Sequence, residues 1–392
     1  MMSLAARREL LKNVAPRYRH SPRAEKTSIL NEFVQNTGYH RKYAIRLLRH
    51  SPPERQKSSR RRARKYPAQI KEPLVTLWRA ANCICGKRLV PFLPELLAVL
   101  ERHREIRVDE PTRALLLQLS PATVDRLLRS ERQGHKKRGL GTTKPGTLLK
   151  KQIPVRTFAD WNETQAGFLE VDLVAHCGSS TDGEYLNSLV LTDIHTTWTE
   201  QVALLNRSQQ TVGAAIAQVR LALPFPLLGL DSDNGSEFIN ANLWHYCQKE
   251  RITFTRSRPY KQNDQAHVEQ NNWTHVRQFV GYGRYEGLTA QRALAELYQS
   301  LRRYMNFFQP TLKLLRKEHL GSRTRKYYDI AKTPYQRVLD CAQASVQTKA
   351  ELQALYRTLN PVALLRELDR LQSRLWALET VRSSDEATLP PE

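Results

Sequence analysis

Three carboxylates stand at positions where a folded core normally holds apolar side chains: Asp172, Asp233 and Glu269. Burying a lone carboxylate costs several kcal/mol, so such a residue usually faces a cation. Three carboxylates brought together can bind two divalent ions, about 4 Å apart, that clamp the attacking and leaving oxygens of a phosphoryl transfer. Because carboxylate oxygens are hard ligands, the expected ion is Mg²⁺. Taken singly, each residue also fits a cap, an ion pair or a surface acid.

Strands are predicted to position the two aspartates. Apolar runs bounded by turn residues predict strands over Gly167–Cys177, Ser188–Asp193 and Leu227–Asp233. The pair Asn234-Gly235 predicts a turn that leaves Asp233 at the C-terminal rim of a sheet, where α/β sheets hold ligands. Helices are predicted over Gln209–Leu223 and Asn240–Arg251. Strands that alternate with helices predict an α/β domain over residues 160–285.

A helix from about Gln265 to Val280 is predicted to carry Glu269. Trp273, Val276 and Val280 follow it at spacings of 4, 3 and 4, so Glu269 is expected in the inward-facing stripe. Other acids near the triad are expected to have lesser roles. These neighbours are Glu170, Asp193 and Asp231, of which Asp193 is expected to cap a turn. His267 either orients a ligand or has a structural role.

The positive charge of the chain is concentrated at one end. Residues 1–160 contain 36 Lys and Arg against 13 Asp and Glu, a net charge of +23, whereas the remainder is nearly neutral at +1. A surplus of this size repels itself unless a polyanion is the partner, which indicates a nucleic acid.

The first basic segment, residues 1–50, is predicted to be a helix-turn-helix domain. Apolar stripes over 24–50 predict two helices, with Gly38 in the turn between them, where a left-handed backbone favours glycine. The second helix is expected to enter a DNA groove. Its proposed DNA contacts are His40, Arg41, Lys42 and Arg46. A helical hairpin with a merely basic surface fits these residues equally well.

Two basic linkers and a second helical domain are predicted next. Linkers are expected over 51–66 and 133–159, with a helix-turn-helix-like domain at 67–132 in which Ser120-Pro121 starts a helix. Further DNA contacts are expected at Arg60, Arg61, Arg62, Arg64, Lys65, Lys136, Lys137, Arg138, Lys261 and Arg277.

Residues 286–382 are predicted to be mostly helical, and 383–392 a disordered tail. The basic run Lys313–Lys326 is a candidate DNA contact. Leucines at spacings of 4, 3, 4 and 3 over Pro361–Thr380 predict a helix that packs either on its own domain or on a second copy.

The five scattered cysteines argue against a disulfide framework, and Cys83 and Cys85 are predicted to be buried thiols. No apolar h-region stands at the N-terminus and no apolar run approaches 18 residues, so neither secretion nor a membrane span is expected. A cytoplasmic protein is predicted, with no small-molecule cofactor.

Two sequence blocks carry a resemblance to a known superfamily. The first is LDSDNGSEF (Leu230–Phe238) and the second is RPYKQNDQAHVEQNN (Arg258–Asn272), with 35 residues between Asp233 and Glu269. The pattern resembles the D,D-35-E motif of retroviral-integrase-type catalytic cores, and Phe168–Leu173 matches the strand of the first aspartate. With helical DNA-binding modules ahead of the core, the chain is similar to bacterial insertion-sequence transposases.

The resemblance implies an RNase H-like core with a mixed five-stranded sheet, in which Asp172, Asp233 and Glu269 bind two Mg²⁺ or Mn²⁺ ions. It also implies a polynucleotidyl transferase: water cleaves the element's end, and the freed 3′-OH then attacks target DNA. The implied partners are double-stranded DNA, both terminal inverted repeats and target, and further copies of the chain assembled on the bacterial nucleoid. Many relatives carry Lys or Arg seven residues after the glutamate, whereas this chain has Val276 there and Arg277 next.

Two other functions compete with a transposase. A catalytically inactive or domesticated DNA-binding protein would share the basic N-terminal half, but such a core should have lost a carboxylate, and all three are present. A tyrosine recombinase needs an Arg/His-rich site around a tyrosine nucleophile, and no pattern of equal specificity is found.

Overall fold

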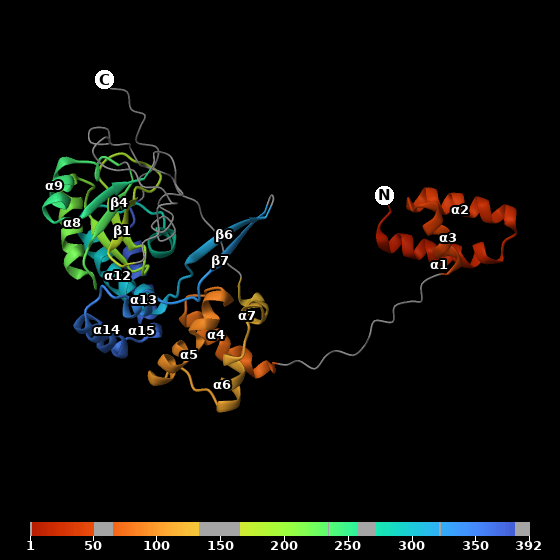
Figure 1. Cartoon of the computed structure of the whole chain (residues 1–392), viewed down its shortest axis with the longest axis horizontal. Helices are drawn as coiled ribbons and strands as arrows, with labels where there is room; N and C mark the ends of the chain where they lie inside the picture. Colours follow the sequence, from red (N-terminus) through yellow and green to blue (C-terminus); the bar gives the residue numbers. More distant parts are fainter. Residues whose placement is uncertain are drawn as a thin grey trace, which may run out of the picture. The chain divides into compact units, whose positions relative to one another are not determined.

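The computed structural model describes residues 2–50, 66–132, 165–233, 235–257, 272–320 and 323–380. The chain divides into two compact units, Met1–Lys65 and Tyr66–Glu392, both drawn in Figure 1. In the described part of the chain, no helix has the length and apolar character needed to cross a membrane.

The first unit consists of three helices around one small apolar core. The helices are α1 (Leu4–His20), α2 (Arg23–Thr37) and α3 (Arg41–Arg49). The predicted stripes supply the core, because Ile29, Phe33, Ala44 and Leu48 are all buried. Gly38 follows α2 with φ +69° and donates its N–H to the Val34 carbonyl, which confirms the predicted glycine turn. Whether α2 and α3 act as a helix-turn-helix remains a prediction.

The second unit begins with a set of short helices. They are η1 (Ala68–Ile70), α4 (Lys71–Ala80), α5 (Gly86–Arg102), α6 (Glu110–Leu117), α7 (Pro121–Leu127) and η2 (Arg129–Glu131). Ser120 caps α7 by accepting the Thr123 N–H at 3.3 Å, as its sequence predicts. These helices share one apolar core with the remainder of the unit. Tyr304 from the C-terminal part reaches them and donates its hydroxyl to the Ala80 carbonyl at 2.8 Å.

The prediction that Cys83 and Cys85 are buried is wrong, because both are exposed. Ile84 between them takes the buried position instead. Its carbonyl accepts a hydrogen bond from the Trp78 indole at 2.9 Å. A bend in the chain, with φ +58° at Cys83, turns the two thiols away from this contact.

The centre of the second unit is a mixed five-stranded sheet, as predicted. Its strands are β1 (Phe168–Ala175), β2 (Asn187–Asp193), β3 (Thr199–Leu204), β4 (Gly229–Ser232) and β5 (Thr253–Arg256), in the order β3-β2-β1-β4-β5. β1, β2 and β3 pair antiparallel, whereas β4 and β5 run parallel to β1. β1, β2 and β4 were expected from their apolar runs. β3 and β5 have too few apolar residues to be found that way.

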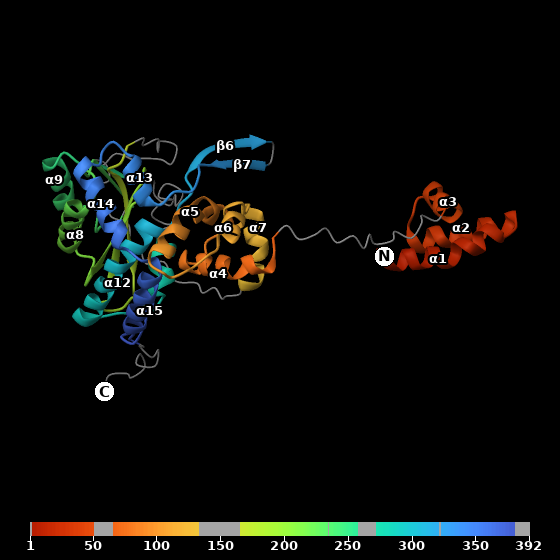
Figure 2. The same cartoon turned by 90° about the horizontal axis from the view of Figure 1, so that it is seen from below.

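The helices α8 (Gln209–Ala222) and α9 (Ala241–Lys249) contact each other and the sheet. They lie side by side in both Figure 1 and Figure 2. Ser208 and Asn240 cap their N-termini, and Pro224 follows α8, so both predicted helices are confirmed.

A long helix, α12 (Gly287–Phe308), lies along the edge strand β3. Asn306 on this helix accepts the Thr199 N–H at 3.0 Å and donates to the Thr199 carbonyl at 2.8 Å. These bonds satisfy backbone groups of the edge strand β3. Without a partner, such groups could pair with a strand of another chain.

The C-terminal part contains the helices α13 (Pro334–Asp340), α14 (Val346–Thr358) and α15 (Pro361–Trp376). The predicted leucine seam lies on α15, where Leu368, Leu371 and Leu375 are buried. α15 packs against α12 of the same chain. Of the two alternatives, packing on its own domain is therefore the one observed.

The predicted mostly helical C-terminal region also contains a β-hairpin. It is formed by β6 (Leu314–Leu320) and β7 (Arg323–Tyr328), which pair antiparallel. Tyr327, Tyr328 and Thr324 favour an extended backbone, which accounts for strands at this point. In Figure 2 the hairpin extends away from the sheet.

Candidate active site

Two of the three predicted catalytic carboxylates lie on neighbouring strands, with Asp172 in the middle of β1 and Asp233 just after the end of β4. β1 and β4 pair in parallel, and Val171 is the partner of Ser232. Asp172 and Asp233 each follow these partners by one residue, so the same register brings them level. Adjacent strands are about 4.8 Å apart, a spacing that allows two carboxylates to share one cation.

Asp172 is half-buried, and both of its carboxylate oxygens accept hydrogen bonds. One carboxylate oxygen accepts the Leu173 N–H at 2.8 Å. The other accepts the side-chain amide of Asn272 at 2.6 Å. Asn272 comes three residues after Glu269 in the sequence, so the segment that follows the predicted third ligand contacts the first one.

Asp233 is held more loosely than its burial would lead one to expect. Its Oδ1 accepts the Gly235 N–H at 2.8 Å, and within the described residues its Oδ2 has no hydrogen-bond partner. Burial raises the pKa of this carboxyl from 3.8 to about 6, and the negative charge of Glu237 adds to the effect. A divalent cation would oppose both causes, since a nearby positive charge favours the ionised form.

The donors at this end of the sheet fit a hard cation better than a soft one. Asp172 and Asp233 offer carboxylate oxygens, which are the ligands that Mg²⁺ prefers. Glu269 lies outside the described residues, as does His267. Among the residues that are described, no group of three metal-ligating side chains is complete.

The neighbouring acids occupy different environments. Glu170 and Asp231 are fully buried one step deeper along the same two strands, where they are register partners. Thr255 on β5 donates its hydroxyl to the Asp231 carboxylate. Asp193 caps a turn as predicted: it accepts the Thr196 N–H and hydroxyl, both at 2.6 Å, and the Gly167 N–H at 2.7 Å.

The segment after Glu269 departs from the predicted regular helix. Asn272–Arg277 (η5) is a π-helical turn, continued by α11 (Gln278–Val280). Trp273 is 46% exposed, so its predicted place in the inward stripe is wrong, whereas Val276 and Val280 are buried as expected. The π-helical turn explains the difference, because its side chains do not follow the 3.6-residue repeat of an α-helix on which the prediction was based. Such turns occur frequently at functional sites.

Arg277 makes internal contacts. Its guanidinium donates to the carbonyl of Ala175, the last residue of β1, at 3.0 Å and to the Gly281 carbonyl at 3.3 Å. It also lies over the Tyr282 ring at 4.9 Å. Arg277 thus ties the segment after Glu269 to the strand that carries Asp172. Its predicted contact with DNA remains a prediction.

The predicted DNA contacts of the first unit lie on one exposed stretch. His40 precedes α3 as its N-terminal cap residue, and Arg41, Lys42 and Arg46 are exposed on the helix itself. Arg41 also donates to the Asn31 side chain on α2. The other predicted contacts fall outside the described residues: Arg60, Arg61, Arg62, Arg64, Lys65, Lys136, Lys137, Arg138 and Lys261.

Sequence reasoning missed two residues of this site. Asn272 stands one helical turn after Glu269, a spacing that already places both residues on one face. Glu237 follows Asp233 by four residues and is buried. An acid two residues after the predicted Asn-Gly turn was a usable signal for it.

Comparison with known proteins gives one strong relationship. No protein-family model matches the chain. Over 330 residues the chain is 46% identical to "Uncharacterized protein y4rM" of Sinorhizobium fredii (strain NBRC 101917 / NGR234), an alignment that covers 83% of this chain and 93% of that protein. Among solved structures it is similar to the catalytic core domain of BIV integrase, with a TM-score of 0.30 and 16% identity, over 44% of this chain and 94% of that one. A similarity of that strength carries no argument about fold or function.

Proposed function

The chain belongs to the family of the uncharacterized protein y4rM of Sinorhizobium fredii, and from the placement of its carboxylates we propose that it is a DNA transposase. The proposed reaction is metal-dependent cleavage at the ends of a mobile element, followed by transfer of the freed 3′-OH into target DNA. The proposed catalytic core is RNase H-like, with Asp172, Asp233 and Glu269 as its active-site carboxylates.

The observation that carries the proposal is the register of β1 and β4. Sixty residues lie between Asp172 and Asp233, yet the parallel pairing of Val171 with Ser232 brings the two carboxylates level. Asn272 then connects Asp172 to the segment that contains Glu269. Two half-buried carboxylates side by side on a sheet are a costly arrangement unless a cation is bound there.

Each residue has a distinct role in the proposed site. Asp172, Asp233 and Glu269 would hold Mg²⁺ or Mn²⁺, and two such ions would supply the positive charge that stabilises an in-line phosphoryl displacement. The amide of Asn272 would keep the Asp172 carboxylate in one orientation, since it binds one of its two oxygens. Asn272 is therefore a positioning residue.

The partners follow from the proposed reaction. The basic first 160 residues would bind the terminal inverted repeats, and the α3 surface with His40, Arg41, Lys42 and Arg46 is the described candidate for that contact. Joining two ends to one target requires more than one copy of the chain on DNA, so a homo-oligomer bound to the nucleoid is part of the proposal.

Strand-transfer assays with single-residue variants test the proposal. The substrate is a duplex taken from inverted repeats that flank the coding region. We expect Asp172→Asn, Asp233→Asn and Glu269→Gln each to reduce Mg²⁺-dependent joining by a factor on the order of 10³, the scale of losing one electrostatic catalytic group. Binding of the element's end should stay within about twofold, because the basic N-terminal segments supply it.

Asp369→Asn is the matched control, because Asp369 is an exposed carboxylate on α15. It should join DNA at the rate of the unmodified chain. Retained joining in any of the three site variants would refute the assignment. A wild-type chain that binds the repeats but never joins them, with either metal, would favour an inactive DNA-binding protein.

A further inference from the structure

The β6–β7 hairpin is a strongly basic ribbon. Residues 314–328 contain five Lys and Arg and one Glu, a net charge of +4. Arg316, Lys317, Arg325 and Lys326 are all exposed. A hairpin of two strands is marginally stable by itself in water, so its structure depends on how it is attached and on what it contacts.

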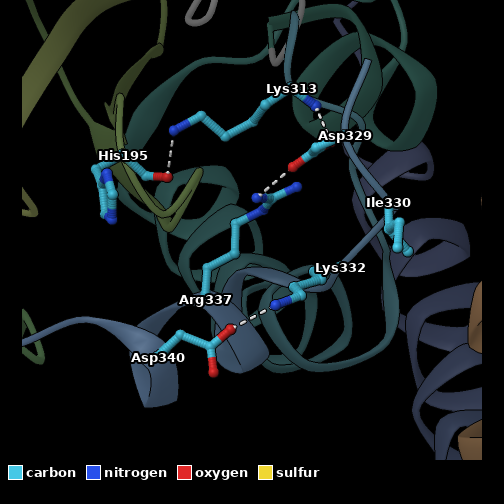
Figure 3. A pocket seen from close by; sticks show the side chains of 7 residues that line it. All are labelled: His195, Lys313, Asp329, Ile330, Lys332, Arg337 and Asp340. Atoms are coloured by element: carbon cyan, nitrogen blue, oxygen red, sulfur yellow. Dashed lines mark hydrogen bonds and ion pairs between the residues drawn. The ribbon is translucent and has the colours of Figure 1, made fainter. Parts of the chain in front are cut away.

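The root of the hairpin is anchored to the second unit by buried polar contacts, shown in Figure 3. Asp329, just after β7, accepts the Lys313 N–H at 2.7 Å and forms an ion pair of 2.8 Å with Arg337 on α13. The Lys313 ammonium donates to the His195 carbonyl in the turn between β2 and β3, at 2.7 Å. The two ends of the ribbon are therefore tied to each other, to α13 and to the sheet.

One face of the ribbon is tied together internally. Tyr327 lies between two guanidinium groups, with Arg316 at 4.2 Å and Arg325 at 4.9 Å from the ring centre. The tyrosine hydroxyl also donates to the Glu318 carboxylate at 2.7 Å. The Arg316–Tyr327 contact and the Tyr327–Glu318 hydrogen bond stiffen the ribbon, since the first joins a cross-strand pair and the second a diagonal one.

The other face carries a like-charge pair. Lys317 on β6 is the register partner of Lys326 on β7, and both are exposed. Like charges directly opposite each other on a sheet are destabilising. The pair concentrates positive charge on this face of the ribbon. An anionic surface laid against that face would remove the repulsion and gain two favourable contacts.

We propose that the β6–β7 hairpin is a DNA-binding ribbon whose Lys317–Lys326 face lies against the phosphates of duplex DNA. The inference rests on the proposed function, which makes DNA the partner of this unit. A two-stranded ribbon has dimensions that the major groove of B-DNA admits. Lysine contacts to phosphate carry no sequence information, so the ribbon would position DNA without selecting a sequence.

Salt-dependent DNA binding by the full-length chain tests the ribbon. The variant is Lys317→Gln with Lys326→Gln, which keeps side-chain length and removes both charges. We expect the slope of log Kd against log salt to fall by about 2, and affinity at moderate salt to fall roughly tenfold, because each phosphate contact contributes about one unit of slope. Fluorescence anisotropy with a labelled duplex and no divalent metal measures both.

Two further variants make the result specific. Arg292→Gln with Arg303→Gln removes two exposed cations from α12 and should leave the slope unchanged. Lys317→Arg with Lys326→Arg retains both charges and should restore the slope and the affinity. Together they separate the ribbon from a general loss of positive charge.

Several outcomes would overturn the inference. An unchanged slope in the glutamine variant would do so, as would an equal fall in the α12 control. A change in oligomeric state by light scattering, with DNA affinity unaltered, would show that the ribbon docks a second copy instead. Failure of the proposed function is distinguishable: a chain that binds duplex through the ribbon but never joins strands would refute the transposase and leave the ribbon intact.

Discussion

Asp193 and Asp233 lie in the same sheet domain, and burial raises the pKa of each to about 6. Their surroundings differ sharply. Asp193 accepts three hydrogen bonds, from the Gly167 N–H and from the Thr196 N–H and hydroxyl. Within the part of the chain that the structure describes, Asp233 accepts one, from the Gly235 N–H. The negative charge of another acid, Glu237, raises its pKa further.

The comparison shows how a structural carboxylate differs from one that is prepared for a ligand. The Asp193 carboxylate needs no further partner, because the donors around it already bind both of its oxygens. Around Asp233, the described residues supply one donor, the Gly235 N–H, and the negative charge of Glu237. A raised pKa alone therefore does not identify a functional acid; the number of its hydrogen-bond partners is what separates the two cases.

The largest expected effect is an opposite change in stability when either residue becomes alanine. Asp193→Ala leaves two buried backbone N–H groups without acceptors, so we expect it to lower the free energy of unfolding by about 2–4 kcal/mol. Asp233→Ala removes a buried charge and one hydrogen bond, so the metal-free chain should be unchanged or about 1 kcal/mol more stable. Urea unfolding of the metal-free chain measures both.

Added Mg²⁺ should affect the stability of the two alanine variants differently. It should stabilise the wild-type chain and the Asp193→Ala variant, since bound metal favours the folded state, but not the Asp233→Ala variant. If the two alanine substitutions destabilised the chain equally, Asp233 would be a structural residue like Asp193.

A smaller effect is expected from pH. Between about pH 4 and 6 the folded chain keeps protons on Asp193 and Asp233 that the unfolded chain has lost, so the free energy of unfolding of the metal-free chain should fall as pH rises through this window. Each group contributes a slope of at most about 1.4 kcal/mol per pH unit.

Unfolding curves measured at several pH values check this expectation. Asp233→Ala should remove its own part of the slope and leave that of Asp193 in place. A slope that Asp233→Ala does not alter would mean that the carboxyl titrates at its ordinary pKa in the folded chain.

The weakest effect is expected at Arg277, a cation with internal contacts, which is compared with the exposed hairpin residue Lys326. Arg277 donates to two backbone carbonyls, whereas Lys326 on the hairpin is exposed. We expect Arg277→Gln to lower the free energy of unfolding by about 1–2 kcal/mol through these lost hydrogen bonds, and to leave the salt slope of DNA binding unchanged. Anisotropy and urea unfolding on the same preparation test it. A fall in the salt slope would show that Arg277 contacts phosphate after all.

Local sequence was sufficient for several elements. Long apolar runs predicted β1, β2 and β4, and glycine and proline signals predicted the turn at Gly38 and the end of α8. These features depend on neighbouring residues only. β3 and β5 were missed because they are short and have few apolar side chains, so their extended backbone depends on pairing with other strands. The hairpin was missed for a similar reason: a basic, polar run has no core face to show a period of two.

The order of residues alone gives the identity and spacing of the three carboxylates, the concentration of basic residues in the first 160 positions and the separation of a strand-rich centre from helical flanks. The folded chain was needed to show that Asp172 and Asp233 lie level, that Asn272 holds one of them, and that the carboxylate of Asp193 already has its hydrogen-bond donors. The physical reason is that the cost of a buried charge depends on which donors surround it. Those donors come from segments up to 100 residues away along the chain.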